Sequence, residues 1–250
     1  MKFASVSIAV LALALAGAAS AQTTNSTQID VTHVTSTLNA NVQDVTGAVS
    51  NTSAALGNSL SVTAANASTL NNYQASAAGV NATLNAMVKD VTGAVSNTAA
   101  AIGNSASVNL SGSVQNLNST QVSRNTDPSA TLNATVQSVN GAVSNTSAAI
   151  GNSLSVTGNV WGTTNNSQYN SAPINATLNA TVNGVTGDVS NTAAAIGDSL
   201  STTGGAGVIN NSQYNSANVT ATANATVRNV TGTVTNTAAA IGNSASITIK

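Results

Sequence analysis

His33 is the only histidine in the chain, and it lies three residues after Asp30 in the segment IDVTHVTS. With any of the many serines, these two side chains could form a Ser-His-Asp triad for acyl transfer. However, the G-x-S-x-G turn that presents such a nucleophile is missing. A zinc site needs three or four ligands, and the chain contains neither cysteine nor glutamate. We interpret His33 as a solvated or locally capping side chain, and we expect no catalytic residue, no metal site and no cofactor.

Carboxylates offer a second kind of chemistry, but they are scattered along the chain. Asp44 and Asp90 precede a VTG tripeptide, whereas Asp188 follows one, so no pair has the fixed arrangement that glycoside hydrolysis needs. The nonapeptide rich in Gly and Asp that binds calcium in some repeat proteins is also missing. We therefore expect the aspartates to be solvated residues at corners of the chain. The six are Asp30, Asp44, Asp90, Asp127, Asp188 and Asp198.

Aromatic side chains are the remaining candidates for ligand binding. Tyr169 and Tyr214 are 45 residues apart in nearly identical segments, so they should occupy equivalent positions. Together with Tyr73 and Trp161 they could face carbohydrate, but stacking of the tyrosines on each other is the simpler interpretation.

The composition excludes several classes of protein. Charged residues make up only 4% of the chain, far below the roughly 25% of ordinary soluble domains. Because the formal net charge is −1, the chain cannot bind nucleic acid by releasing counterions. The bulk is Ala, Asn, Ser, Thr, Val and Gly. This composition is typical of a solenoid or of a protein that associates with itself by stacking.

The first 21 residues have the features of a secretory signal peptide. An apolar run at Ser7–Ala16 is followed by the small residues Ala19–Ala21, and this run is too short to span a membrane. We expect a mature chain that starts at Gln22, is secreted to the extracellular space or cell surface, and has no integral membrane segment. Residues 22–34 are interpreted as an entry segment.

The segment NTAAAIGNS at Asn97–Ser105 belongs to a set of five identical or closely similar copies, whose glycines are 46, 48, 46 and 45 residues apart. A constant period of roughly 20 to 50 residues indicates a repeat architecture. We therefore expect residues 35–250 to form five repeats of about 46 residues. The Gly-Asn pairs and two tyrosines should be the repeat corners and stacking positions. These positions are Gly57, Asn58, Gly103, Asn104, Gly151, Asn152, Gly197, Gly242, Asn243, Tyr169 and Tyr214.

The secondary structure has two interpretations. Leu132, Val136, Val139 and Val143 follow a heptad-like spacing, which is typical of a coiled coil. The residues between them are Asn, Thr, Ser and Gly, which are weak helix formers, while Thr and Val favour strands. We predict strands, and we leave a helical turn open for the NTAAAI run.

A β-solenoid unites these features, and we predict an all-β fold of this kind (a β-helix) built from the five repeats. Its coils stack at about 4.8 Å, so small side chains fill a narrow core and stacked asparagines form hydrogen-bonded ladders. The working interpretation is two rungs of about 23 residues in each period. One larger rung of three or four strands is the alternative.

The stretch GNSLSVTGNVWGTTNNSQYNSA at Gly151–Ala172 resembles the Gly-Asn and Gln-x-Asn repeats of bacterial functional amyloids, the curli-type and Fap-type fibre subunits. The AIGNSASV segment at Ala101–Val108 is similar to the β-roll head repeats of trimeric adhesins. The chain also resembles bacterial holdfast-attachment proteins. These resemblances imply a cell-surface or matrix fibre protein, and they add no site residue.

The sequence therefore predicts a secreted, non-enzymatic structural protein that forms or decorates extracellular amyloid-like fibres in biofilm or surface attachment. The expected partner is a second copy of the chain, joined at the terminal coils by β-pairing, and a secretion channel or nucleator is a further candidate partner. One alternative is a monomeric solenoid adhesin or a module that binds ice or carbohydrate. Such a module would need a flat face of Thr-x-Thr, and this motif does not recur at one place in every copy. A helical, heptad-based surface protein is another alternative.

Overall fold

The computed structural model describes residues 12–17, 23–64, 67–124 and 127–249, and none of these residues is helical. The helical alternatives, both the heptad and the turn in the NTAAAI run, are therefore wrong for the described residues. The strands are β1 (Ala12–Gly17), β2 (Thr23–Asp30), β3 (Val34–Thr46), β4 (Val49–Ala64), β5 (Ala67–Ser76), β6 (Val80–Thr92), β7 (Val95–Ser123), β8 (Ser129–Val139), β9 (Val143–Asn170), β10 (Ile174–Val185), β11 (Val189–Gly204), β12 (Ala206–Asn215), β13 (Val219–Val230) and β14 (Val234–Ile249).

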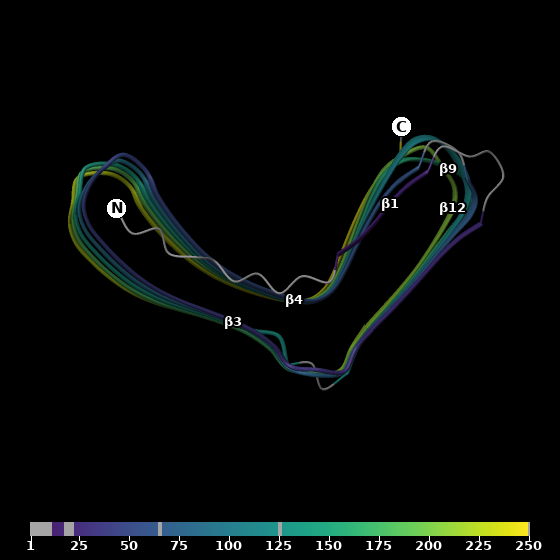
Figure 1. Ribbon diagram of the computed structural model, residues 1–250, viewed down its shortest axis with the longest axis horizontal. Coiled ribbons are helices and arrows are strands. Elements are labelled where there is room, and N and C mark those ends of the chain that lie inside the picture. Colours follow the sequence, from purple (N-terminus) through teal and green to yellow (C-terminus); the bar gives the residue numbers. More distant parts are fainter. Residues whose placement is uncertain (1–11, 18–22, 65–66, 125–126, 250) are drawn as a thin grey trace.

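All the strand pairs are parallel, and they form two sheets. The small sheet has the order β13-β10-β8-β6-β3, and the large sheet has the path β1-β4-β7-β9-β11-β14, with β2, β5 and β12 attached beside it. In Figure 1 the strands of successive coils overlie one another along a flattened loop that is bent near β4 into two arms. One arm carries β3, and the other carries β1, β12 and the second half of β9. The arrangement is consistent with the predicted β-solenoid.

The pairing register follows the sequence period residue by residue. Val34 pairs with Val80 in the small sheet, and Val49 pairs with Val95 in the large sheet. A coil therefore uses a whole period, and the working interpretation of two shorter rungs in each period is wrong. The coil instead combines a strand of the small sheet, a long strand that crosses the bend, and a return segment in the second arm. The return segment is a separate strand such as β5 or the second half of a long strand such as β9.

Alternation of small apolar and polar residues makes these segments strands with one buried face. In β10, Ile174, Leu178 and Val182 are buried in alternation with more exposed Asn and Thr residues. The buried residues form two clusters. The first lies between the small sheet and the first half of the long strands and includes Leu84, Leu132 and Leu178. The second, which includes Leu117 and Leu154, lies in the other arm.

Each small-sheet strand carries a left-handed backbone position near its end. Asp44, Asp90, Ser138 and Asn229 have φ values between 52 and 54°, and the matching residue Gly184 has φ +69°. Asp, Asn and Gly tolerate this conformation better than other residues do. The expectation of exposed corner aspartates is therefore confirmed for Asp44 and Asp90. The described residues contain no helix of the length and apolar character that crossing a membrane requires.

Candidate functional site: polar ladders and an outer sheet face

The glycines and asparagines of the nonapeptide lie inside long strands, at the bend between the two arms, and not at chain turns. Gly57 and Asn58 in β4 are adjacent and both buried, so the face of the strand that points inward switches at this pair. β9 and β11 show the same switch at Gly151-Asn152 and Gly197-Asp198. The pair therefore lets one strand contribute to both cores while its path bends.

Glycine is required at this bend because the backbones of successive coils approach closely there. A Cβ atom on Gly57 would lie 2.6 Å from the carbonyl oxygen of Gly103. On Gly151 it would lie 2.5 Å from the carbonyl oxygen of Gly197. Gly242 differs, because a Cβ there would meet only the Asn215 Nδ2 atom at 3.7 Å. The glycine thus serves the contact with the following coil.

The asparagines at the bend form a buried ladder along the stack. Asn58 Nδ2 donates to Asn104 Oδ1 (2.8 Å), and Asn104 Nδ2 donates to Asn152 Oδ1 (2.7 Å). Asn152 in turn donates to Asp198 Oδ1 over 2.7 Å. In the last coil, Asn243 Nδ2 turns to the backbone oxygen of Gln213 at 3.3 Å. The structure thus brings Asn58, Asn104 and Asn152 into one hydrogen-bonded row that ends on a carboxylate.

Asp198 is fully buried, and its second oxygen, Oδ2, has no hydrogen-bond partner within the described structure. Burial raises the pKa of this carboxyl from 3.8 to about 6, and the hydrogen bond from Asn152 lowers it in part. Asp30 is also buried, and it accepts hydrogen bonds from the backbone and hydroxyl of Thr32. The expectation that the aspartates are solvated corner residues is therefore wrong for Asp30 and Asp198.

Asparagine ladders as such were predicted, but two further buried ladders lie at positions that were not named from the sequence. Gln74, Gln121, Gln168 and Gln213 each donate to the glutamine of the preceding coil at 2.7–2.8 Å, beginning with Gln28. Their Nε2 atoms also bind backbone oxygens across the bend. The first residue of the nonapeptide forms a ladder from Asn51 to Asn236. The sequence signal for both ladders was that the same residue type, glutamine or asparagine, recurs at the repeat period.

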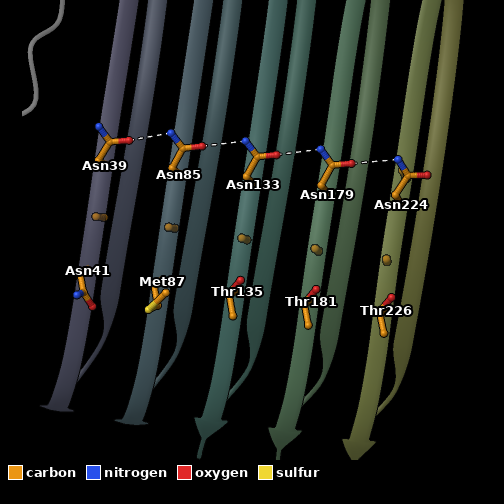
Figure 2. Close-up of a pocket in the computed structure, with 16 residues that line it drawn as sticks. Asn39, Asn41, Asn85, Met87, Asn133, Thr135, Asn179, Thr181, Asn224 and Thr226 are labelled. Atoms are coloured by element: carbon orange, nitrogen blue, oxygen red, sulfur yellow. Dashed lines mark hydrogen bonds between the residues drawn. The ribbon is translucent and has the colours of Figure 1, made fainter.

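The outer face of the small sheet carries an exposed ladder. Asn85, Asn133, Asn179 and Asn224 each donate to the asparagine before them, starting at Asn39, at 2.7–3.0 Å (Figure 2). A second row beside it consists of Asn41, Met87, Thr135, Thr181 and Thr226. The two rows border an open groove of about 990 Å³, whose lining residues carry no charge.

A row of threonines continues this face on the other side of the asparagine ladder. Thr37, Thr83, Thr131, Thr177 and Thr222 are aligned by the register of the small sheet. A regular Thr-x-Thr motif is not present, but Thr-x-Asn recurs at one place in all of these strands. The adhesin or ice-binding alternative was expected to need a Thr-x-Thr face, and in these strands asparagine occupies the second position of that pattern.

The aromatic residues lie on the second arm. The rings of Tyr169 and Tyr214 stack with centroids 5.3 Å apart and planes 10° apart, and the Arg124 guanidinium lies 5.3 Å from the Tyr169 centroid. This confirms the predicted stacking of the two tyrosines. Tyr73 does not join them, because it pairs in register with Thr120. Trp161 is 70% exposed.

No cluster of three or more His, Cys, Asp or Glu residues occurs in the part of the chain that the structure describes. His33 is exposed in the turn between β2 and β3. The Asp30 carboxylate beside it binds Thr32, so the triad considered from the sequence does not form through this aspartate. The described geometry instead consists of polar ladders and exposed sheet faces.

These features define a class of protein: an all-β chain of stacked parallel strands, held by polar ladders and almost free of charge. Residues 4–249 match the family HfaD, described as holdfast attachment protein D, and the chain belongs to this family. The resemblance to holdfast-attachment proteins is thereby confirmed. No curated protein and no solved structure matches the chain. Family membership indicates a role in attachment at the cell surface.

Proposed function

We propose that the chain is a secreted structural protein that forms or decorates extracellular amyloid-like fibres for surface attachment. Its five solenoid coils stack on those of neighbouring copies, so that each copy extends the sheets of the next. The partner is a second copy of the chain, and a secretion channel or nucleator assists assembly. The role in attachment is supported by the family.

The observation that carries the proposal is the open edges of the outermost coils. Within the described residues, β13 pairs only with β10, and β14 pairs only with β11. At the other end, β3 pairs only with β6, and β2 only with β5. Exposed strand edges are templates for pairing with another chain. Terminal coils of soluble solenoids normally carry a polar cap, whereas β14 exposes Val234, Ile247 and Ile249.

The near absence of charge supports stacking of copies, because like charges repeated at each coil would repel one another. The described structure contains a single ion pair, between Lys89 and Asp90 at 3.5 Å. Asparagine and glutamine ladders stabilise cross-β stacks, and both kinds run the length of this chain.

Negative-stain electron microscopy of Gln22–Lys250 tests the proposal after dilution of the chain from denaturant. We expect uniform unbranched fibrils, with fibre diffraction at about 4.8 Å along the axis. Discrete particles that remain separate under conditions in which circular dichroism shows folded β structure would refute intrinsic self-assembly.

A second candidate function is a module that binds neutral polysaccharide, and the Thr-x-Asn face of the small sheet favours it. Each asparagine in the exposed ladder is held by its neighbours, so its remaining amide hydrogen and oxygen lone pair are already oriented (Figure 2). Preorganised groups lose less entropy on binding. An uncharged, repetitive row fits an uncharged polymer of hydroxyl groups that lies along the stack.

Calorimetric titration with cellohexaose and chitohexaose tests this second function. We expect Asn133→Ala to weaken binding about fivefold, because one lost hydrogen bond costs roughly 1 kcal/mol of binding free energy. Asn165→Ala is the matched control, because Asn165 belongs to an exposed asparagine ladder on the other sheet. Equal affinities for the two variants and the unmodified chain would exclude this face as the binding site.

A further inference from the structure

Each polar ladder runs in one direction, so its two ends are chemically different. In the outer asparagine ladder every Nδ2 donates toward the N-terminal coil, which leaves the Asn224 oxygen as an acceptor at one end and the Asn39 amide as a donor at the other. The glutamine ladder has the same direction, from Gln213 to Gln28. When two copies meet head to tail, donors face acceptors in these ladders, whereas a head-to-head contact opposes like groups.

The buried nonapeptide ladder runs in the opposite direction and gives the same result. Asn51 donates to the coil after it, and Asn236 accepts the last bond from Asn191. The Asn236 amide is thus a donor at the C-terminal coil, and the Asn51 oxygen is an acceptor at the N-terminal coil. Both directions of hydrogen bonding therefore select the same head-to-tail contact.

One register satisfies all the open strands at once. Continuing the observed pairing places β13 on β3 of a second copy, with Asn224 beside Asn39. It places β14 on β4, with Asn236 beside Asn51. Because β12 pairs with β9, β9 with β7, β7 with β5, and β5 with β2, the same register places β12 on β2 of the second copy. The ends of the stack thus match as three neighbouring strand pairs.

Side chains at the two ends complement each other in this register. Tyr214 of one copy would lie on Ile29 of the next, and these side chains are 56% and 61% exposed in the single chain. Asn215 would face Asp30, whose Oδ2 atom lies 3.4 Å from the Ser76 hydroxyl on its other side. An aspartate that has only acceptor atoms would then receive donors from both directions.

The predicted leader occupies part of this contact. Strand β1 pairs with β4 from Ser59 to Ala64. Strand β4 pairs with β7, β7 with β9, β9 with β11, and β11 with β14, so Ser244–Ile249 are the equivalents of Ser59–Ala64 in the last coil. In the continued register, Ser244–Ile249 of a preceding copy would therefore pair with the same edge of β4. One edge cannot pair with both strands.

We infer that mature chains join head to tail, with β12, β13 and β14 of one copy on β2, β3 and β4 of the next, and that β1 blocks this contact until the leader is removed. The inference rests on the proposed stacking function and adds its polarity, its register and its control. The leader thereby delays assembly until secretion.

The test compares Met1–Lys250 with Gln22–Lys250, each refolded by dilution and followed by light scattering and electron microscopy. We expect the mature chain to form fibrils and the full chain to remain unassembled. A substoichiometric amount of the full chain should shorten the fibrils, because it adds through its C-terminal coil and leaves a blocked edge. Equal assembly of the two chains would overturn the block by β1, whereas failure of both would overturn the proposed stacking itself.

Two variants of the last coil test the register. Asn236→Asp keeps the acceptor for Asn191 but places an acceptor against the Asn51 oxygen of the next copy, so it should abolish fibrils of the mature chain. Asn224→Asp makes the same charge change and loses the exposed bond that Asn224 donates to Asn179, yet it still presents an acceptor to the Asn39 amide, so assembly should persist. If both variants assemble equally well, the register is wrong.

Gly242→Ala supplies a second variant that leaves the single chain folded. The added Cβ has room within one copy. In the stack it would meet the carbonyl oxygen of Gly57 from the next copy, as a Cβ on Gly151 would meet Gly197. If the Gly242→Ala chain folds but forms no fibrils, the register is supported. If it forms fibrils as long as those of the unmodified mature chain, the register is contradicted.

Discussion

A ladder residue must donate to one neighbour and accept from the other, and this rule explains why asparagine and glutamine occupy the buried rows. Asp198 is the exception, since an ionised carboxylate can only accept. It accepts from Asn152, and its Oδ2 atom remains without a partner in the described structure. The buried row at the bend therefore ends one coil before Asn243. In the described strands Asp198 lies between Asn152 and Asn243 of the neighbouring coils, and both of these residues are uncharged.

We expect the stability of the chain to depend on the protonation of Asp198. Because burial raises the pKa of the folded-state carboxyl from 3.8 to about 6, the folded state binds more protons than the unfolded state between these values. The free energy of unfolding should therefore fall as the pH rises through this window, by on the order of 3 kcal/mol. Urea denaturation at a series of pH values, at a concentration that keeps the chain monomeric, measures this dependence.

Asp198→Asn should remove the pH dependence in that window and raise stability at neutral pH. The amide needs no ionisation, and it can continue the ladder by donating toward Asn243. Asp188→Asn is the control: Asp188 is exposed, and its oxygen accepts from the Thr233 backbone amide, as an asparagine oxygen would. If Asp198→Asn retains the same pH dependence as the unmodified chain, the buried carboxylate is not its cause.

At the scale of the strand, the repeated Gly-Asn pair allows one long strand to serve two cores. The inward face switches at this pair, so the strand packs on the small sheet before the bend and on the return strand after it. A residue with a side chain at the glycine position would separate the coils, since the carbonyl of the next coil lies directly against it. The close approach of successive coils at this point therefore requires glycine.

Gly151→Ala should destabilise the single chain, whereas Gly242→Ala should not. The methyl group on residue 151 would lie within 3 Å of the Gly197 oxygen and the Ile174 Cδ1 atom, and overpacking of this kind costs roughly 1–3 kcal/mol. At residue 242 the same methyl group meets only an ordinary contact at 3.7 Å. Thermal or urea unfolding of the two variants measures the difference. Equal losses would mean that glycine is needed for its backbone conformation and not for the approach of the coils.

At the scale of the whole molecule, each coil is stabilised by its neighbours, as in other solenoids. Inner coils are covered on both sides, while the described last coil leaves Val219, Ala223 and Val227 only partly buried against the first core. A second copy would cover these residues and extend the outer asparagine ladder, the nonapeptide asparagine ladder and the glutamine ladder. The same repetition that builds the chain therefore provides the geometry for joining chains.

The sequence alone was sufficient for the all-β class, the period and several stacking positions. Equal positions in a parallel stack pair with each other, so Tyr169 and Tyr214 could be aligned from their spacing and are found stacked. The left-handed corners at Asp44 and Asp90 could likewise be inferred, because their residue type and position next to Gly-containing turns are local features.

The tertiary structure alone decided how many strands form a coil, where the chain bends and which side chains are inside. The inward face switches at Gly57-Asn58, so a rule of simple alternation read from one end of β4 gives the wrong face at the other end. A charged residue next to a glycine is typical of a surface corner, yet the folded chain buries Asp198 completely beside Asn152. Local spacing determines which residues repeat, whereas their burial depends on strands that the fold brings from elsewhere in the chain.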